Sequence, residues 1–383
     1  MIVLSCFDGM SCGQIAFERA GIKIDKYYAS EIDKYAIKVT QSNYPDTVQL
    51  GSITEWQSWN IEKPDIIIGG SPCQGFSFAG KGLNFDDPRS KLFFEFYEIL
   101  KQYKPKYFLF ENVIMKKESN DVISSLLGEL YPECVTYPEL FRTGRLEPIE
   151  INSALVSAQN RRRLYWTNIP GIEQPENKGI LLKDVIENGE CDRNKSLPIT
   201  ATYIFAGNEN DYVKKSKRQL VIKCGAIRGR NPENPTSRES GLDTVQMLEI
   251  RDDEKTNTLT SVQKDNVLCY AENYIQYDLL GKEHNSQNMR IFFKEKQSGC
   301  LNVSHSSIPK IKETETEILY RKLTVRECAR LQTVPENIID KMLNCGVSNS
   351  QLYKMLGNGW TVEVISHIFS YIPELKIENS KNR

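Results

Sequence analysis

Short apolar runs alternate with amphipathic stretches through the first 115 residues, and this alternation restricts the fold more than any other feature. Helical spacing of apolar residues is found between the runs, at 13–20, 34–42 and 91–101. Strands separated by helices imply an α/β domain, with a parallel sheet covered by helices on both faces. Ligands of such sheets lie at the carboxyl ends of the strands. The expected strands are Met1–Cys6, Lys26–Ala29, Pro64–Gly69 and Tyr107–Phe110.

The pattern weakens from about Gly171 to Thr316, where short strand-like runs are broken by Gly, Asn and Pro. The runs are QLVIKCGAI, NVLCYA, IQYDLL and RIFF. Helical character returns at 324–331 and 360–371. We therefore predict a catalytic domain of residues 1–175, completed by 340–383, and a smaller, irregular, β-rich domain of residues 176–339.

The net charge of −1 excludes a chain that binds polyanions through its overall charge. Val213–Arg238, however, holds eight basic residues and one acid, so a basic patch is present locally. A solvated loop with surplus lysines is the alternative interpretation. The basic residues of greatest interest there are Lys214, Lys215, Lys217, Arg218, Arg228 and Arg230.

The remaining composition points to an intracellular protein. No apolar stretch reaches the ~18–20 residues that span a bilayer, and the first ten residues lack the basic region and cleavage site of a signal peptide. The ten cysteines are scattered, with no C-x-x-C pair and no neighbouring His. We expect a cytoplasmic protein without disulfides, zinc or a membrane segment.

Two strand ends predict a nucleotide-like ligand. The first strand runs into F7-D-G-M-S-C-G13, a turn of small residues that lets a ligand approach the backbone where a helix starts. The next strand ends in S30-E-I-D33, where a carboxylate can accept hydrogen bonds from ribose hydroxyls. Together these motifs indicate a cofactor that contains adenosine.

The third strand end, I68-G-G-S-P-C-Q-G-F-S77, indicates a nucleophile. Cys73 follows Pro72 at the end of an apolar run, so we expect its thiol to be exposed on a fixed turn, although a structural cysteine is the alternative. The glycine-containing segment 76–89 carries Lys81 and Arg89 and is predicted to be a loop that closes over a substrate.

The fourth strand end presents Glu111, whose carboxyl group is expected to be partly desolvated and able to donate a proton near neutral pH. An ion pair with a nearby Lys or Arg is the alternative. Period two predicts that Arg161 and Arg163 share one side of a strand, where two guanidinium groups can hold a carbonyl oxygen and a phosphate.

The ordered motifs resemble those of the DNA (cytosine-5)-methyltransferases, with a Rossmann-like S-adenosylmethionine-dependent sheet. The similarity covers roughly 1–170 and 318–372. Some segments resemble the animal de novo cytosine methyltransferases, whereas the QNRRR and GN motifs are of the bacterial or phage type. The matching blocks are FDGMSCG, SEID, GSPCQGFS, LFENV, QNRRR, RKLTVRECARLQ and LGNGWT.

The resemblance implies that Cys73 adds to carbon 6 of a cytosine flipped out of the duplex, while Glu111 holds and protonates ring nitrogen 3. Carbon 5 then receives the methyl group. Arg163 would bind the cytosine carbonyl oxygen. The supporting residues would be Arg161 and Gln159, which shape the site, and Asn112 and Pro72, which brace it.

The resemblance also implies S-adenosylmethionine as cofactor, S-adenosylhomocysteine as its product, and no metal. One position departs from the family, which usually has an acidic residue where Ser52 stands here, so cofactor binding is expected to persist but to be weak. The implied cofactor residues are Phe7, Gly9, Ser11, Glu31, Ile32, Ser52, Ile53, Leu92, Asn358 and Trp360.

Double-stranded DNA is the implied partner, read by the central domain, and the segment from Arg321 to Gln332 is expected to be scaffold. We expect a monomer that serves restriction-modification or orphan phage modification, beside a cognate endonuclease that would act separately. A tRNA cytosine methyltransferase and an inactive DNA-binding regulator are the alternatives. Besides the central basic residues, the expected DNA contacts are Gln74, Ser77, Lys81 and Arg89.

Overall fold

The computed structural model describes residues 1–71, 88–135, 144–188, 191, 194–201, 203, 220–222, 224–230, 245–250, 267–268 and 320–373. The chain forms two compact units. The first comprises Met1–Ile180, Pro198–Ile204 and Cys328–Arg383, and the second comprises Leu181–Leu197 and Phe205–Glu327. Of the helices within the described ranges, none is long and apolar enough to cross a membrane.

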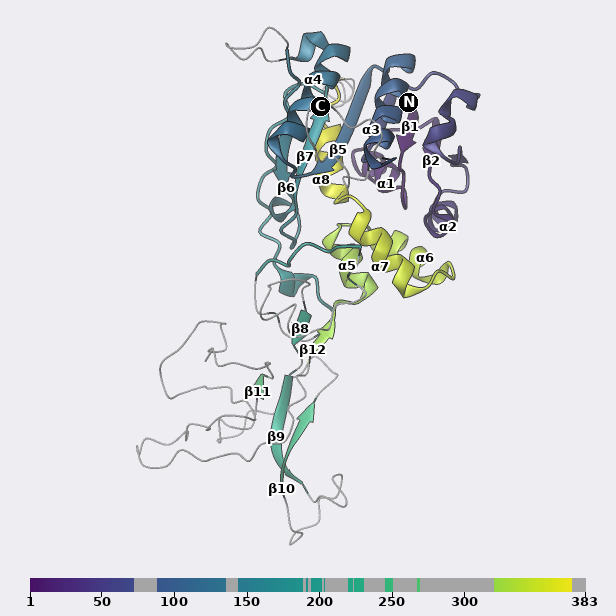
Figure 1. The fold of residues 1–383 in the computed structure, drawn as a ribbon. Helices are drawn as coiled ribbons and strands as arrows, with labels where there is room; N and C mark the ends of the chain where they lie inside the picture. The colour runs from purple at the N-terminus through teal and green to yellow at the C-terminus, as the bar shows by residue number, and fades with distance from the viewer. Residues whose placement is uncertain are drawn as a thin grey trace, which may run out of the picture. The chain divides into compact units, whose positions relative to one another are not determined.

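The first unit is built on a seven-stranded sheet in the order β3-β2-β1-β4-β5-β7-β6 (Figure 1). The strand β4 reads Ile-Ile-Ile-Gly and is buried along its whole length, as expected for a central strand covered on both faces. The strands are β1 (Ile2–Cys6), β2 (Lys26–Ser30), β3 (Val48–Gln49), β4 (Ile66–Gly69), β5 (Tyr107–Val113), β6 (Ile149–Asn152) and β7 (Arg162–Thr167).

The expectation of a parallel sheet, drawn from the first 115 residues, is confirmed for the strands of that region. Strands β6 and β7, which follow it in the chain, add an antiparallel edge. Strands β3, β2, β1, β4 and β5 are parallel, whereas β7 pairs antiparallel with both β5 and β6. Because β7 continues the pairing, β5 extends three residues beyond the predicted Phe110, and Glu111 lies opposite Tyr165. A short connection from β6 allows the antiparallel arrangement, since parallel neighbours need a longer crossover.

Helices cover both faces of the sheet. On one face α3 and α4 pack over an aromatic cluster in which the Phe93 and Phe110 ring centroids lie 5.2 Å apart. Elsewhere α1 packs on α8 through stacked Phe17 and Phe369 rings 4.0 Å apart. The helices are α1 (Cys12–Arg19), α2 (Lys34–Asn43), α3 (Pro88–Tyr103), α4 (Lys117–Leu130), α5 (Val325–Leu331), α6 (Glu336–Asn344), α7 (Asn349–Asn358) and α8 (Val362–Phe369). The 3-10 turns are η1 (Ile53–Ser58), η2 (Pro132–Cys134), η3 (Ser153–Leu155) and η4 (Leu182–Asp184).

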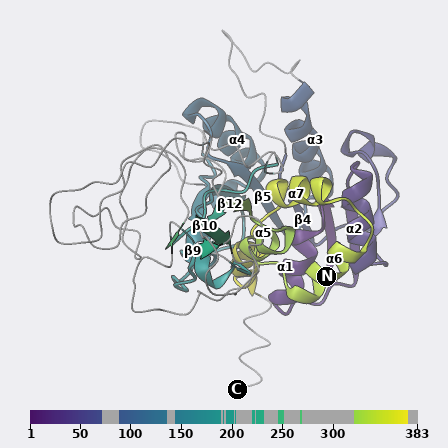
Figure 2. The same cartoon turned by 90° about the horizontal axis from the view of Figure 1, so that it is seen from below.

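Helices α6 and α7 are present in the structure but were not predicted from the sequence. Figure 2 shows α6 beside α2, and the two helices are in contact. The signal for α6 was present in its amphipathic spacing, because Ile338, Ile339 and Met342 are its buried residues. On α7, Gly357 lies directly against the backbone of Thr200, so a segment from the middle of the chain packs against the C-terminal part within this unit.

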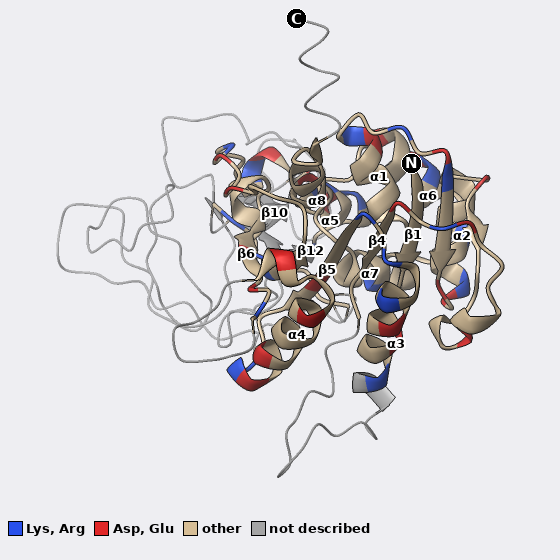
Figure 3. Cartoon of the chain, turned by 90° about the horizontal axis from the view of Figure 1, so that it is seen from above, with Lys and Arg blue, Asp and Glu red and all other residues tan. Residues whose placement is uncertain are grey.

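The charged residues of α3 and α4 include both signs along each helix (Figure 3). On α4, Asp121 pairs with Arg145 at 2.9 Å. Neither helix therefore presents a surface of one sign, as expected from the nearly neutral composition.

The second unit contains short antiparallel pairings. Strand β9 pairs with β10 and β11, and β8 pairs with β12. The run QLVIKCGAI forms strands as predicted and NVLCYA does so in part, whereas IQYDLL and RIFF lie outside the described residues. The strands are β8 (Leu220–Ile222), β9 (Cys224–Arg230), β10 (Val245–Ile250), β11 (Val267–Leu268) and β12 (Tyr320–Lys322).

Substitution of Gly357 by Ala tests the packing of the 198–203 segment on α7. An alanine Cβ would come within 2.2 Å of the Thr200 carbonyl carbon, so backbone must move. The change should lower the free energy of unfolding by about 1–3 kcal/mol, although Gly to Ala inside a helix normally raises it. Urea unfolding measures the effect. Ser350→Ala, exposed on the same helix, is the control and should be nearly neutral; equal results for both variants would contradict the packing.

Candidate active site

At the third strand end, the structure describes the chain as far as Ser71. Five predicted residues lie outside the described part of the chain: Pro72, Cys73, Gln74, Ser77 and Lys81. Lys214, Lys215, Lys217 and Arg218 also lie outside it. Arg89 is the second residue of α3, and Arg228 and Arg230 occupy alternate positions of β9 opposite Met247 and Val245; the side chains of these three arginines are outside the description.

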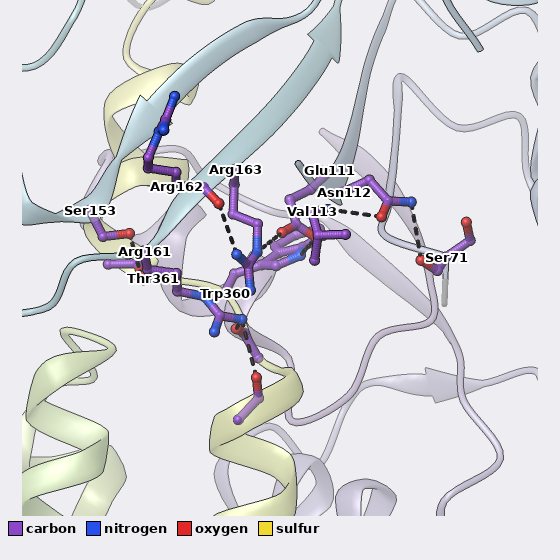
Figure 4. A network of polar contacts seen from close by, with 12 residues as sticks. Ser71, Glu111, Asn112, Val113, Ser153, Arg161, Arg162, Arg163, Trp360 and Thr361 are labelled. Carbon is purple, nitrogen blue, oxygen red and sulfur yellow. Dashed lines mark hydrogen bonds and ion pairs between the residues drawn. The ribbon is translucent and has the colours of Figure 1, made fainter. Parts of the chain in front are cut away.

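Glu111 is buried at the sheet edge where β4 and β5 end, with 9 % of its surface exposed. Oε1 of its carboxylate lies 3.0 Å from Nε of Arg163, and Oε2 accepts a hydrogen bond of 3.0 Å from Nε1 of Trp360 (Figure 4). The carboxylate is therefore buried and is also paired with an arginine, as in the alternative interpretation, whereas its role as a proton donor stays a prediction. A Cβ atom built on Gly70 would come within 2.8 Å of Oε2, so this carboxylate also lies against the end of β4.

Asn112 ties β5 to the segment that leads into Pro72 and Cys73. Its side chain is buried, and Nδ2 donates to the Ser71 carbonyl oxygen over 3.3 Å (Figure 4). Its Oδ1 accepts from the backbone N–H of Val113 at 2.8 Å, which fixes the orientation of the amide. This contact holds the last described residue before the predicted nucleophile.

Arg161 and Arg163 occupy different environments. The strand begins one residue later than expected, at Arg162, so Arg163 lies on β7 and Arg161 directly precedes it. The Arg161 guanidinium donates to three backbone carbonyl oxygens, those of Ile199 (3.0 Å), Gly357 (3.1 Å) and Gly359 (2.9 Å). Burial, reinforced by the Arg163 charge, lowers the pKa of Arg161 to about 10. Arg161 thus joins three chain segments.

Gln159 is fully buried beside the same segment. Its Oε1 accepts from the backbone N–H of Ile199 at 3.4 Å. Within the described part of the chain its Nε2 has no hydrogen-bond partner, and neither has the hydroxyl of Ser71. Buried donors of this kind are costly to leave unmatched and are found where a ligand or water completes the site.

The turn after β1 has the strained backbone expected of a close-approach turn. Phe7, Gly9 and Ser11 all have φ of 60°, a region that disfavours side chains larger than glycine. The Glu31 carboxylate accepts from the backbone N–H of Gly9 at 2.8 Å, and also from those of Ile32 (2.7 Å) and Asp33 (2.8 Å). Glu31 therefore joins the ends of β1 and β2.

The other predicted cofactor residues differ in exposure. Ile32 is 76 % exposed, whereas Ile53 is buried. Ser52 precedes η1, and its hydroxyl accepts from the Thr54 N–H at 3.3 Å, so it has a capping role. Leu92 packs partly buried against the aromatic cluster, and Asn358 is exposed at the end of α7.

Sequence reasoning missed a buried polar cluster beneath this turn. Asp8 accepts from the Tyr27 hydroxyl at 2.8 Å and from the Ser11 hydroxyl, which in turn accepts from Thr40 at 3.2 Å. Burial raises the pKa of Asp8 from 3.8 to about 6; the hydroxyl donors oppose this shift and the Glu31 charge adds to it. A signal was available, because an acidic residue directly after an apolar strand is a candidate for burial.

The segment from Arg321 to Gln332 contributes structural contacts. In the second unit Glu327 accepts from the N–H groups of Glu187 (2.6 Å) and Thr324 (2.7 Å), and Arg326 lies 3.7 Å from Glu187. In the first unit the Gln332 amide donates to the Leu356 carbonyl at 2.7 Å. These contacts fit the expected scaffold role of this segment.

The first unit is a Rossmann-like sheet with polar residues at its strand ends, and comparison with known proteins gives its family. The profile of the family "C-5 cytosine-specific DNA methylase" matches residues 1–131 and 152–374. The chain belongs to this family and is a DNA cytosine methyltransferase. Membership implies S-adenosylmethionine as the methyl donor.

Two relatives match along nearly the whole chain. The orphan methyltransferase M.SPRI of Bacillus phage SPR is 27 % identical over 96 % of each chain. The type II methyltransferase M1.ScrFI of Lactococcus lactis subsp. cremoris is 29 % identical over 99 % of this chain and 79 % of its own. Among solved structures, a DNMT2 mutant from Spodoptera frugiperda shares the fold, with a TM-score of 0.52, 17 % identity and coverage of 97 % and 98 %.

Replacement of Asp8 by Asn tests the buried cluster through the pH dependence of stability. The folded chain holds the Asp8 proton more tightly than the unfolded chain, so protonation stabilises the fold as pH falls from about 6 to about 4. The neutral variant should equal or exceed the natural chain in stability near pH 7.5, by at most on the order of 2–3 kcal/mol, and lose this advantage near pH 4. Urea unfolding across this range measures the difference, and a constant difference would contradict the burial of an ionised Asp8.

Proposed function

We propose that this enzyme methylates carbon 5 of cytosine within a specific double-stranded DNA sequence, through a covalent adduct with Cys73 and a base flipped out of the duplex. The observation that carries the proposal is the fixed Glu111 carboxylate, held by Arg163 and Trp360 beside the strand end that leads to Cys73. A buried, immobilised carboxyl group is suited to proton exchange with a ring nitrogen.

The chain's residues divide the chemistry as follows. The Cys73 thiolate attacks carbon 6 of the cytosine, while Glu111 holds and protonates nitrogen 3, which accepts the electrons displaced from the ring. Arg163, which already contacts Glu111, binds the cytosine carbonyl oxygen. Bound S-adenosylmethionine supplies the electrophilic methyl group for carbon 5. Loss of the carbon 5 proton then restores the double bond and releases the Cys73 sulfur.

The strand ends of β1 and β2 fit S-adenosylmethionine. The strained turn at Phe7–Ser11 allows close approach to its backbone, and three backbone N–H groups orient the Glu31 carboxylate toward a fixed direction. The exposed apolar side chain of Ile32 follows Glu31 and offers a surface for a flat aromatic base. Trp360, in contact with Glu111, completes the proposed pocket.

We propose that the part of residues 176–339 that belongs to the second unit, Leu181–Leu197 and Phe205–Glu327, reads the target sequence. The positively charged segment Val213–Arg238 would supply phosphate contacts, as would Lys81 from the segment after Cys73 and Arg89 from the first turn of α3. The full-length relatives include an orphan phage enzyme and a type II enzyme. We therefore propose a role in site-specific DNA modification, with a cognate endonuclease, where one exists, acting separately from this cytoplasmic monomer.

Replacement of Cys73 by Ala tests the covalent mechanism. Plasmid DNA from a methylation-free host that expresses the natural chain should show protected cytosines in one recurring context by cytosine-conversion sequencing. The variant should show none, because no sulfur can add to carbon 6, while its S-adenosylmethionine affinity stays within a few-fold. Cys345→Ala, which removes a half-buried thiol outside the proposed site, is the control. Methylation by the Cys73 variant would refute the mechanism, and an inactive natural chain would favour RNA as the substrate.

Replacement of Ser52 by Asp tests the unusual residue of the cofactor pocket. Asp caps a helical turn as well as Ser does, so η1 should persist, and the added carboxylate can accept from the adenine amino group. The dissociation constant for S-adenosylmethionine should fall about three- to tenfold, as expected for one hydrogen bond to a charged group. Calorimetric titration measures it. Ser52→Asn, similar in size but uncharged, is the control; equal affinities for the two variants would contradict the prediction.

A further inference from the structure

The bond between Trp360 and Glu111 joins residues that are 249 positions apart in the chain. It gives each carboxylate oxygen its own donor, a guanidinium for Oε1 and an indole N–H for Oε2 (Figure 4). Two donors from different elements prevent rotation of the carboxylate about its last side-chain bond. The indole donor carries no charge and does not titrate, so it orients Glu111 without competing for its proton.

The backbone around Trp360 is fixed by buried side chains on both sides. Before it, the Gly359 carbonyl accepts from Arg161 at 2.9 Å. After it, the Thr361 hydroxyl accepts from Ser153 at 2.9 Å (Figure 4). The same hydroxyl donates to Gln332 at 2.9 Å. A fully satisfied buried network of this kind specifies one conformation. The network therefore determines where the indole N–H points.

The opposite edge of the indole lies against the start of α1. A Cβ atom built on Gly13 would be 3.7 Å from Cζ3 of Trp360, and one built on Gly359 would be 3.4 Å from the sulfur of Cys12. Cys12 and Gly13 directly follow the strained turn that ends at Ser11. The Trp360 ring thus lies between the proposed cofactor turn and the Glu111 carboxylate.

We infer that Trp360 is a positioning residue for Glu111, and that its indole N–H couples the cofactor turn to the group that protonates the base. This inference rests on the proposed function, because it assigns Trp360 a task in the same reaction. This role differs from lining the cofactor pocket, because lining the pocket requires the aromatic ring of Trp360 but not its N–H. Loss of the N–H alone should then impair turnover more than cofactor binding.

Trp360→Phe separates these two roles, because phenylalanine keeps an aromatic ring and lacks the donor. In the full-length protein with DNA substrate, kcat should fall about 10- to 100-fold, as expected when a charged group loses one hydrogen bond. The dissociation constant for S-adenosylmethionine, measured by calorimetry, should change less than about threefold. Trp59→Phe is the matched control: within the described residues the Trp59 N–H is buried without a hydrogen-bond partner, so this variant should keep the natural kcat.

A double-mutant cycle with Glu111→Gln shows whether Trp360 acts through Glu111. In single-turnover assays Trp360→Phe should slow the Glu111→Gln enzyme far less than it slows the natural enzyme. Equal slowing in both backgrounds, or a rise in the S-adenosylmethionine dissociation constant that matches the loss of kcat, would overturn the inference. Failure of the proposed function is a different result, because the natural chain itself would then lack Cys73-dependent methylation.

Gly70→Ala disturbs the same bond from another direction, which matters if Trp360→Phe does not fold. The new methyl group would come within 2.8 Å of Oε2 of Glu111 and 3.2 Å of Nε1 of Trp360. It should lower kcat with little change in S-adenosylmethionine affinity, as the Phe variant does. A Gly70→Ala enzyme with unchanged kcat would argue against a requirement for this carboxylate position.

Discussion

A buried carboxylate needs hydrogen-bond donors, and the donors of Glu111 determine how distant parts of this chain must meet. Leaving one member of a buried ion pair without its partner costs about 3–5 kcal/mol. Arg163 and Glu111 are ion-pair partners because β7, which carries Arg163, pairs antiparallel with β5, which carries Glu111. Trp360 supplies the second donor only if the C-terminal segment returns to the sheet after the second unit has been completed.

Arg161 makes that return possible. A cation that is 4 % exposed is costly to bury, and here it is matched by backbone carbonyls from the 198–203 segment and from the end of α7. Residues 205–327 belong to the second unit, and the acceptors lie on both sides of them in the chain: Ile199 before, and Gly357 and Gly359 after. These contacts make Arg161 part of the scaffold of the first unit.

The sequence was sufficient for features that depend on local pattern. Strands β1, β2 and β4 and helices α1, α2 and α3 follow from apolar runs and helical spacing, and the candidate residues at their ends follow from the rule for parallel sheets. Strand β5 ends later than expected because its extra residues pair with β7, a partner that its own sequence does not reveal. The roles of Arg161 and Trp360 depend on carbonyl and carboxylate groups far away in the chain, so spacing could not predict them.

Two carboxylates, those of Glu31 and Asp8, lie next to the turn after β1, and their surroundings differ. Glu31 receives three backbone N–H groups, which fix the direction of its carboxylate. Asp8 is buried beneath the turn with hydroxyl partners, and burial raises its pKa to about 6. Positive φ at two non-glycine residues of the turn costs of order 1–3 kcal/mol each. The carboxylates accept hydrogen bonds that oppose this cost and stabilise the strained turn, Glu31 from the Gly9 N–H and Asp8 from the Ser11 hydroxyl.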